Sequence, residues 1–241
     1  PQLFWKYLWD YGSFIQHTPH TSILENSDQM PGAKWFSGAN INFAQNLLKY
    51  RDDRIAITAY DERGKQQQIS YAQLYQKVAH LSTWFKQQGI QPGDRIVAFM
   101  PNVPEDIIAM LAATSIGAVW SSCSPDFGLQ GVVDRFGQIQ PKIIITTDGY
   151  FYNSKTINSL EKLKPILKDI TSIEQIIVVP YIESELTNDE CSQRLDNEKC
   201  SGSVHLWQEC LSLGEQENTD SLIEFVPLPF DHPLYILYSS G

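Results

Sequence analysis

The distribution of apolar and polar residues predicts short strands that alternate with amphipathic helices from residue 54 onward. Residues 55–60 are predicted to form a strand, residues 61–64 a turn and residues 66–69 the return strand of a hairpin. Several later strands are apolar at every position, and the connections between elements are short. Both features are typical of a mainly parallel sheet with helices on both faces, so the predicted fold class is α/β.

A capping box marks the start of the first long helix. Ser70 is followed three residues later by Gln73, and this pair predicts a helix that begins there and extends to about Gln88. Gly89 then ends it. The apolar face of this helix consists of four residues at helical spacing: Leu74, Val78, Leu81 and Phe85.

The rest of the chain continues the alternation of strands and helices. Strands are predicted over residues 95–100, 118–120, 143–146 and 175–179. Helices are predicted over residues 40–50, 104–116, 128–139, 159–169 and 204–211. Because ligands of parallel sheets bind beyond the carboxyl ends of the strands, three loops are candidate site segments: residues 101–104, 121–128 and 239–241.

The first fifty residues are rich in aromatic side chains and have little regular periodicity between Gly12 and Gly38. The aromatic residues are Phe4, Trp5, Tyr7, Trp9, Tyr11, Phe14, Trp35, Phe36 and Phe43. A segment of this kind usually wraps a neighbouring domain, and its rings fix it there. We therefore predict an N-terminal cap over residues 1–50 and a main domain over residues 51–241.

The net charge of −10 argues against a nucleic-acid partner, because phosphate backbones attract clustered Lys and Arg. The excess is local, since residues 183–224 contain eleven acids and only Arg194 and Lys199 oppose them. We interpret this stretch as a solvated acidic surface insertion. No apolar run approaches the ~20 residues that a membrane-spanning helix needs, so we expect no membrane span.

The four cysteines do not form a recognisable metal site. Cys123, Cys191, Cys200 and Cys210 include no Cys-x-x-Cys pair, and their spacing around His205 does not match structural zinc sites. We expect reduced thiols, a cytoplasmic location and no metal ligands. The chain also has no Gly-x-Ser-x-Gly elbow and no histidine placed as a base, so a nucleophilic serine is disfavoured.

Residues 121–128 are the most unusual string in the chain, with the sequence Ser-Ser-Cys-Ser-Pro-Asp-Phe-Gly. This string follows a predicted buried strand and precedes a helix, so its backbone N–H groups are able to point at an anion. The alternative is a structural turn in which Asp126 caps the helix. The spacing alone leaves both interpretations open. Glycine spacing excludes a Gly-x-Gly-x-x-Gly dinucleotide motif.

The end of the chain predicts a phosphate-binding loop. Residues 234–238 are apolar and are predicted to form a buried strand, which leads into Ser239, Ser240 and Gly241. A strand that opens into a Ser/Gly loop turns N–H groups and hydroxyls toward phosphate oxygens. Lys155 follows another predicted strand end, where a lone lysine is usually a solvated charge.

Three strings resemble the acyl-CoA synthetase (adenylate-forming) superfamily, and in particular its acetoacetyl branch, the acetoacetate–CoA ligases. Residues 35–48 are similar to the segment that closes the N-terminal cap of acetyl- and acetoacetyl-CoA synthetases. Residues 117–128, followed by residues 134–139, resemble the acetoacetyl branch, since acetyl-CoA enzymes carry a Phe-Gly-Gly-type string instead of Ser-Pro-Asp. Residues 152–155 resemble that branch's Tyr-Asn-Gly-Lys, with Ser154 in place of the glycine.

A fourth string lies at the end of the chain, where residues 238–241 resemble the start of the superfamily's Ser-Ser-Gly-Thr-Thr-Gly-x-Pro-Lys phosphate loop. The resemblance covers nearly the whole chain, and only residues 183–224 lack a recognisable motif. It implies that residues 51–241 are a partial AMP-binding (adenylation) domain that stops within the phosphate loop.

The resemblance implies a two-step reaction. ATP and Mg²⁺ activate acetoacetate as an acyl-adenylate with release of pyrophosphate, and the CoA thiol then displaces AMP to give acetoacetyl-CoA. By the same resemblance, Ser239, Ser240 and Gly241 begin the ATP phosphate loop. The residues implied to bind CoA are Ser124, Pro125, Asp126, Phe127, Gly128 and Lys155. Lys155 would neutralise a phosphate of the CoA nucleotide, although Phe151 stands where acetyl-CoA enzymes place an arginine.

We expect the chain to be an N-terminal fragment whose main partner is the missing C-terminal part of the same enzyme. The rest of the phosphate loop, the acyl pocket and the catalytic lysine of the superfamily would all follow Gly241. We therefore expect no catalytic residue within the chain and no ligase turnover by it alone. Two alternatives stay open: a non-catalytic module that binds CoA or a partner, and a ligase of the superfamily for another short carboxylic acid.

Overall fold

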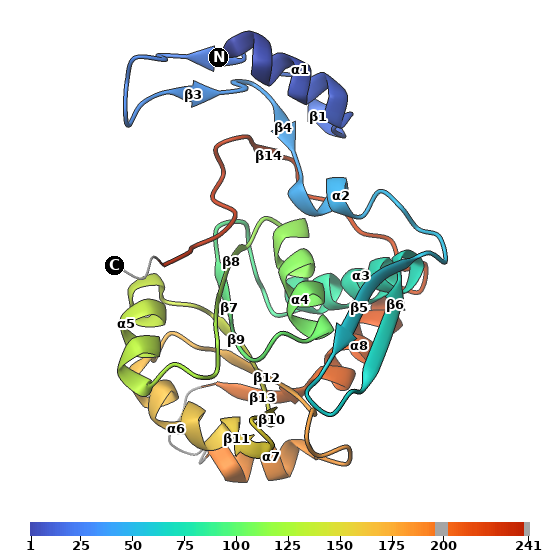
Figure 1. Ribbon diagram of the computed structural model, residues 1–241, viewed down its shortest axis with the longest axis vertical. Coiled ribbons are helices and arrows are strands. Elements are labelled where there is room, and N and C mark those ends of the chain that lie inside the picture. Colours follow the sequence, from blue (N-terminus) through green and yellow to red (C-terminus); the bar gives the residue numbers. More distant parts are fainter. Residues whose placement is uncertain (196–201, 239–241) are drawn as a thin grey trace.

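The computed structural model describes residues 1–195 and 202–238. Its centre is a parallel sheet of five strands in the order β13-β12-β9-β7-β8, and every neighbouring pair runs parallel (Figure 1). The strands are β7 (Arg95–Phe99), β8 (Val119–Cys123), β9 (Ile143–Thr147), β12 (Gln175–Val179) and β13 (Ser203–Leu206). The predicted α/β class with a parallel sheet is confirmed.

Helices cover both faces of this sheet. One layer contains α3 (Tyr71–Gln87), α4 (Pro104–Ser115) and α8 (Trp207–Glu217), and the other contains α5 (Leu129–Ile139), α6 (Ser159–Asp169) and α7 (Asn188–Leu195). Successive strand residues point to opposite layers, so that Ile143 and Ile145 pack into the first core while Ile144 packs into the second. This alternation explains why the central strands are apolar at every position.

The capping box begins α3 as predicted. The Ser70 hydroxyl accepts the Gln73 N–H at 3.2 Å, and the Gln73 side chain accepts the Ser70 N–H at 3.0 Å. Both bonds satisfy N–H groups that a helix start otherwise leaves without partners. The predicted apolar face of α3 is buried against α4 and α8.

Two antiparallel hairpins extend from the main sheet. The first, β5 (Ile55–Tyr60) with β6 (Gln66–Ser70), was predicted from the sequence, whereas the second, β10 (Gly149–Tyr152) with β11 (Lys155–Asn158), was not. Asn153 and Ser154 form the turn of the second hairpin with φ values of +51° and +60°. A two-residue turn of this type favours Asn-Gly, and the absence of the glycine removed the signal.

The N-terminal segment forms a separate layer beside the main sheet (Figure 1). Its elements are α1 (Gln2–Gly12), β1 (Gln16–Thr18), β2 (Leu24–Glu25), β3 (Lys34–Trp35), β4 (Asn40–Ile41) and α2 (Phe43–Leu47). Strand β4 pairs with β1 and with β14 (Leu228–Pro229), a strand from the far end of the chain. The helix predicted over residues 40–50 is therefore shorter, because its first residues belong to a strand.

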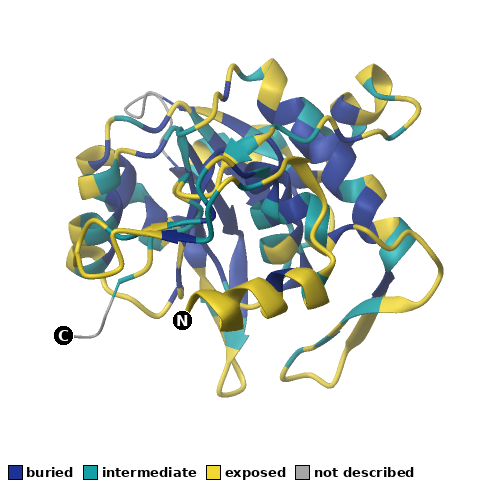
Figure 2. Ribbon diagram, turned by 90° about the horizontal axis from the view of Figure 1, so that it is seen from above, coloured by how far each residue is buried: buried dark blue, intermediate teal, exposed yellow. Residues whose placement is uncertain are grey.

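Aromatic rings connect this N-terminal layer to the segment that follows β14. The rings of Trp9 and Phe36 stack with centroids 4.2 Å apart, and the Phe230 ring lies 5.0 Å from that of Phe36. Other rings of α1 point to solvent, and Figure 2 shows this helix as exposed along most of its length.

The structure corrects two further predictions about element boundaries. Residues 121–123 were predicted to begin a loop, but they continue β8 and pair with residues 97–99 of β7. Their polar side chains do not fit an apolar strand pattern, so the sequence did not predict a strand there. In the structure the Ser121 hydroxyl donates to the Ile236 carbonyl at 2.8 Å. Residues 204–206, predicted to be helical, form strand β13 at the sheet edge, and the helix begins only at Trp207.

The acidic stretch is more integrated than the predicted surface insertion. Its described part supplies β13, α7 and α8, and it buries Cys191, Leu195, Trp207 and Cys210 in the two cores. The apolar residues decide its place in the fold, while Glu215 and Glu217 lie on the exposed side of α8.

The segment at residues 234–238 is not the buried strand that we predicted. Tyr235 forms a single parallel bridge with Trp120 of β8, and Leu237 is 81% exposed. The segment does lie along β8, since the Trp120 N–H donates to the Leu234 carbonyl at 3.0 Å and the Ile236 N–H donates to the Trp120 carbonyl at 2.9 Å. It is half exposed because it lies beyond the edge strand of the sheet.

Of the helices in the described ranges, none has the combination of length and apolar character needed to cross a bilayer.

Candidate ligand-binding site

A cavity lies where the carboxyl ends of β7 and β8 meet the β10–β11 hairpin. Its volume is about 270 Å³, and it is lined by residues 100–102, 122–126 and 150–152 together with Asp106. Two of the three loops predicted from the sequence therefore meet at one place. Ligands of open α/β sheets bind at such positions.

The loop after β8 forms one wall of this cavity. The Phe127 N–H donates to the Ser124 carbonyl at 3.2 Å, which closes a turn, and the Ser124 hydroxyl donates to the Asp126 carboxylate at 3.2 Å. Helix α5 begins after Gly128, and no side chain in the described part of the chain caps it. The alternative in which Asp126 caps this helix is therefore wrong.

The Asp126 carboxylate is held by residues that the sequence did not single out. The Tyr150 hydroxyl donates to it at 2.8 Å, and the Lys162 ammonium donates to that hydroxyl at 3.0 Å and to the Pro125 carbonyl at 2.9 Å. Burial, together with the hydrogen bond to Asp126, raises the pKa of Tyr150 to about 12. The tyrosine consequently keeps its proton at neutral pH and acts as the donor.

The second carboxylate at the cavity has no such support. Within the described ranges no side chain forms a hydrogen bond or ion pair with the carboxylate of Asp106, which lies in the first turn of α4. Burial raises the pKa of Asp106 to about 6. This residue therefore adds negative charge to the cavity at pH 7.

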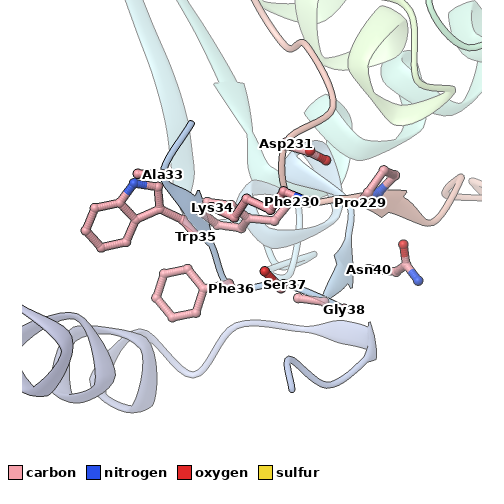
Figure 3. A pocket seen from close by; sticks show the side chains of 11 residues that line it. Ala33, Lys34, Trp35, Phe36, Ser37, Gly38, Asn40, Pro229, Phe230 and Asp231 are labelled. Carbon is pink, nitrogen blue, oxygen red and sulfur yellow. The ribbon is translucent and has the colours of Figure 1, made fainter. Parts of the chain in front are cut away.

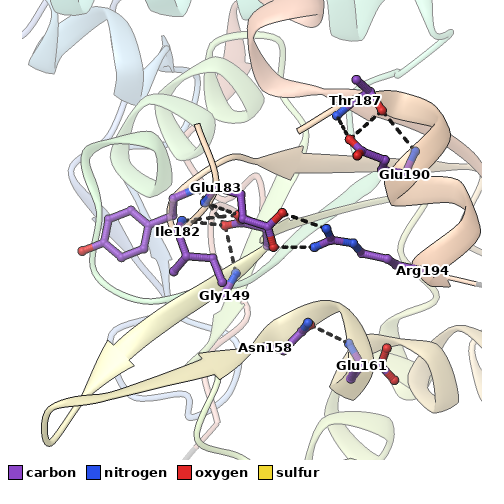
Figure 4. A network of polar contacts seen from close by, with 10 residues as sticks. Gly149, Asn158, Glu161, Ile182, Glu183, Thr187, Glu190 and Arg194 are labelled. Atoms are coloured by element: carbon purple, nitrogen blue, oxygen red, sulfur yellow. Dashed lines mark hydrogen bonds and ion pairs between the residues drawn. The ribbon is translucent and has the colours of Figure 1, made fainter. Parts of the chain in front are cut away.

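The β10–β11 hairpin is anchored by a buried carboxylate at the end of β9. Asp148 is fully buried and accepts the N–H groups of Gly149 at 2.9 Å, Tyr181 at 2.7 Å, Ile182 at 3.0 Å and Glu183 at 2.8 Å. Figure 4 shows Gly149, Ile182 and Glu183 converging in this way. These bonds join the start of the hairpin to the segment that follows β12.

Arg194 extends the same network. Its guanidinium donates to both carboxylate oxygens of Glu183, at 2.6 and 2.7 Å (Figure 4). A bidentate pair of this kind fixes the orientation of both side chains, and here it connects α7 to the segment after β12. The acidic stretch therefore helps to support the hairpin that lines the cavity.

The tip of the β10–β11 hairpin contacts the tip of the β5–β6 hairpin. The Asn153 N–H donates to the Glu62 carboxylate at 3.1 Å, and the guanidinium of Arg63 lies 3.9 Å from the centre of the Phe151 ring. A cation is thus present beside Phe151, but it comes from a segment about ninety residues earlier and is itself paired with Asp61.

Only some of the residues that were predicted to bind CoA line the cavity. Ser124, Pro125 and Asp126 line the cavity, whereas Phe127 and Gly128 continue the loop outside its lining. Phe127 is 41% exposed and carries the Arg135 guanidinium 4.4 Å from its ring centre. Lys155 is exposed at the start of β11, opposite Tyr152, and does not line the cavity.

The three residues predicted to begin the phosphate loop, Ser239, Ser240 and Gly241, lie outside the described residues. Sequence reasoning missed Tyr150 and Lys162. Side chains alternate between the two faces of a strand, so a strand prediction for residues 149–152 would have placed Tyr150 and Tyr152 on one face. No sequence pattern pointed to Lys162.

A larger cavity of about 420 Å³ lies between residues 33–40 of the N-terminal layer and residues 229–231 (Figure 3). Trp35, Phe36 and Phe230 supply its rings, and Lys34 and Asp231 are its charged residues. The site is assigned to the smaller cavity because that one lies beyond the carboxyl ends of β7 and β8, where ligands of parallel sheets bind.

The described residues contain no cluster of three or more His, Cys, Asp or Glu side chains that would hold a metal ion. Cys123, Cys191 and Cys210 are free and buried, and burial raises the pKa of each thiol. Cys200 lies outside the described residues.

Comparison with known proteins gives concordant matches. The family described as AMP-binding enzyme matches residues 43–241. The acetoacetyl-CoA synthetase of Gallus gallus is 40% identical over 242 residues, which cover 99% of this chain and 35% of that protein. The malonamoyl-CoA synthetase vrtB of Penicillium aethiopicum is 33% identical over 245 residues, covering 99% of this chain and 33% of its own length.

Among solved structures, the acetoacetyl-CoA synthetase from Streptomyces lividans matches with a TM-score of 0.87 and 31% sequence identity. The match covers 100% of this chain and 34% of that structure. The chain therefore spans about a third of the length of the relatives that it matches.

Proposed function

The chain belongs to the AMP-binding enzyme family, and from this membership we propose that it is the N-terminal part of an acetoacetate–CoA ligase. The complete enzyme would convert acetoacetate, ATP and CoA to acetoacetyl-CoA, AMP and pyrophosphate through an acyl-adenylate. The likeness to acetoacetyl-CoA synthetases over 99% of the chain supports this substrate set.

The observation that carries the proposal is the wall formed by residues 124–126. This string resembles the acetoacetyl branch, and it lines a cavity beyond the carboxyl ends of β7 and β8. We assign that cavity to CoA, with Lys155 at the nearby hairpin tip as a candidate partner for a phosphate of the CoA nucleotide. Amide and hydroxyl groups of CoA have polar partners there in Asn102, Ser122 and Ser124.

We further propose that Ser239, Ser240 and Gly241 begin the loop that binds the ATP phosphates. The segment before them supports this, because residues 234–236 are hydrogen-bonded alongside β8 and run parallel to it. The Tyr238 hydroxyl also donates to the Arg135 carbonyl at 2.6 Å, which holds the segment against α5. A parallel segment leads to the same sheet edge as β7 and β8, where the cavity lies.

The expected chemistry depends on charge stabilisation more than on covalent help, because a carboxylate attacks the α-phosphate of ATP. We assign Mg²⁺ to the nucleotide phosphates, whose negative charge a divalent cation neutralises. No residue of the described ranges is assigned a catalytic role, and the chain alone is expected to lack ligase turnover. We also propose a cytoplasmic location, in keeping with the three free thiols.

The identity of the carboxylic acid substrate is the part of the proposal for which a specific alternative exists. A relative with 33% identity over 99% of the chain is a malonamoyl-CoA synthetase, so another short carboxylic acid with a carbonyl at the β-position is the second candidate. The loop 124–126 favours acetoacetate only through its resemblance to that branch. A ligase assay of the complete enzyme with both acids would decide between them.

The test of the proposed function is calorimetric titration of the chain with CoA, with dephospho-CoA and AMP as comparison ligands. We expect saturable 1:1 binding of CoA, weaker binding of dephospho-CoA because it lacks one phosphate, and no competition by AMP. Absence of any CoA binding would contradict the assignment of the cavity. A pyrophosphate-exchange assay of the chain with acetoacetate, expected to be negative, separates a binding role from turnover.

A further inference from the structure

Lys162 differs from the other lysines of its helix in what it contacts. Its ammonium group donates hydrogen bonds to the Pro125 carbonyl at 2.9 Å and to the Tyr150 hydroxyl at 3.0 Å. No ion pair joins it to a carboxylate within the described ranges. Lys164, two residues later on α6, pairs instead with Glu161 of the same helix. Lys162 is therefore directed at the loop after β8 and not at the surface of its own helix.

The direction of the hydrogen bonds through Tyr150 is fixed by its neighbours. An ammonium group only donates and an ionised carboxylate only accepts, so the hydroxyl accepts from Lys162 and donates to Asp126. Tyr150 is 4% exposed, which keeps water from replacing either bond. The result is one continuous chain of hydrogen bonds from Lys162 through Tyr150 to Asp126, which also accepts the Ser124 hydroxyl.

The charge at the cavity explains why such a chain is needed. Asp106 and Asp126 line the cavity, and among residues 1–195 and 202–238 no Lys or Arg does so. CoA carries several phosphate charges, which two uncompensated carboxylates would repel. Lys162, behind the cavity wall, is the cation connected to one of these carboxylates, through a single hydroxyl group.

We propose that Lys162 and Tyr150 are positioning residues for the thiol substrate, which hold residues 124–126 in place and offset the charge of Asp126. This inference rests on the proposed function, because it takes CoA as the ligand of the cavity. Neither residue touches the reacting atoms in this view. Their effect is on the affinity for CoA and on the order of the loop.

The first experiment measures CoA affinity by calorimetry for the unmodified chain and four variants. Lys162→Met removes both hydrogen bonds and the charge, and we expect CoA to bind about tenfold more weakly or worse. Tyr150→Phe is expected to act in the same direction, and Lys162→Arg to recover at least part of the affinity, since a guanidinium also donates. Lys164→Met is the matched control on the same helix and leaves the affinity unchanged. CoA affinity of Lys162→Met within twofold of the unmodified chain would overturn the proposal.

A second measurement separates positioning from charge. If Lys162 acts partly by offsetting Asp126, then Asp126→Asn costs less affinity in the Lys162→Met background than in the unmodified chain. Strictly additive losses would contradict the charge compensation.

Hydrogen exchange of the amides of Ser124 and of residues 126–128 tests the positioning without any ligand. We expect roughly tenfold faster exchange in Lys162→Met, confined to this loop, with exchange in β9 and β12 unchanged as evidence of an intact fold. Unchanged loop exchange would overturn the inference. If the unmodified chain fails to bind CoA, the proposed function fails, and the loop exchange still decides whether Lys162 positions residues 124–126.

Discussion

At the scale of single residues, the two carboxylates of the cavity differ in what surrounds them. Asp126 is supported by hydrogen bonds from Ser124 and Tyr150, whereas Asp106 has no partner for its carboxylate within the described ranges. Burial of an unpaired carboxylate favours its protonated form, which is the cause of the raised pKa of about 6 for Asp106. Such a residue costs stability at neutral pH, where it is mostly ionised.

This difference predicts that Asp106→Asn raises the free energy of unfolding by an amount that depends on pH. The pKa of Asp106 is about 6 in the folded chain and about 3.9 in an unfolded one, so its stabilising contribution is complete below pH 4 and is lost as the pH rises through 6. The variant should therefore unfold with a free energy higher by roughly 2 kcal/mol at pH 7.5 and unchanged at pH 4. Urea unfolding at both pH values measures this, with the exposed Asp28→Asn as control. Parallel pH profiles for Asp106→Asn and the unmodified chain would contradict it.

At the scale of elements, the sequence predicted most strands and helices because the signals that define them, helix caps and apolar runs, involve residues that are neighbours in the sequence. The capping box of α3 and the apolar strands β9 and β12 follow from neighbouring residues. The errors occur where a distant partner decides the structure. Residues 121–123 are polar, yet they are in a strand because β7 supplies the ladder. Tyr150 and Lys162 were missed because their hydrogen-bond partner, the loop after β8, lies 24 to 37 residues away.

The packing of α8 on α3 depends on a close approach at one glycine. A Cβ atom on Gly214 would lie 2.0 Å from the carbonyl oxygen of His80 in α3, a distance that backbone atoms cannot accommodate without moving apart. We expect Gly214→Ala to lower the free energy of unfolding by roughly 2–4 kcal/mol.

Gly137 of α5 is the matched control, because a Cβ atom there would meet nothing within 4 Å. Gly137→Ala should raise the free energy of unfolding by about 0.5–1 kcal/mol, as expected for alanine in place of glycine within a helix. Chemical denaturation of the two variants gives the comparison. If both variants changed the free energy of unfolding by the same amount and in the same direction, the close approach of α8 to α3 would not restrict the residue at position 214.

At the scale of the whole molecule, the N-terminal layer is joined to the main domain at its α2 end and forms a small cluster of its own elsewhere. Asn42 is fully buried and donates hydrogen bonds to carbonyls at the end of α4 and after α8, and Ala44 of α2 belongs to the first core of the main sheet. Among the described residues, the separate cluster of the layer consists of Trp9, Phe36 and Ala39. The assignment of residues 1–50 to a cap stays a prediction. The sequence indicated that rings would hold this segment, but it did not identify Phe230, because the contact joins residues that are about two hundred positions apart.

Phe230, directly after β14, brings the end of the chain into contact with that small cluster, with its ring 5.0 Å from Phe36 and 6.1 Å from Trp9. Because Phe230 is 38% exposed, we expect Phe230→Ala to lower the stability of the N-terminal layer by about 1.4 kcal/mol, less than the loss of a fully buried ring would. That loss should accelerate hydrogen exchange of residues 1–41 roughly tenfold while the amides of β7 and β9 keep their rates, since the large cores do not include this ring. Leu237→Ala, which changes an 81% exposed side chain, is the control and should leave both sets of amides unchanged. Faster exchange throughout the sheet in Phe230→Ala would show instead that the N-terminal layer and the sheet unfold as one cooperative unit.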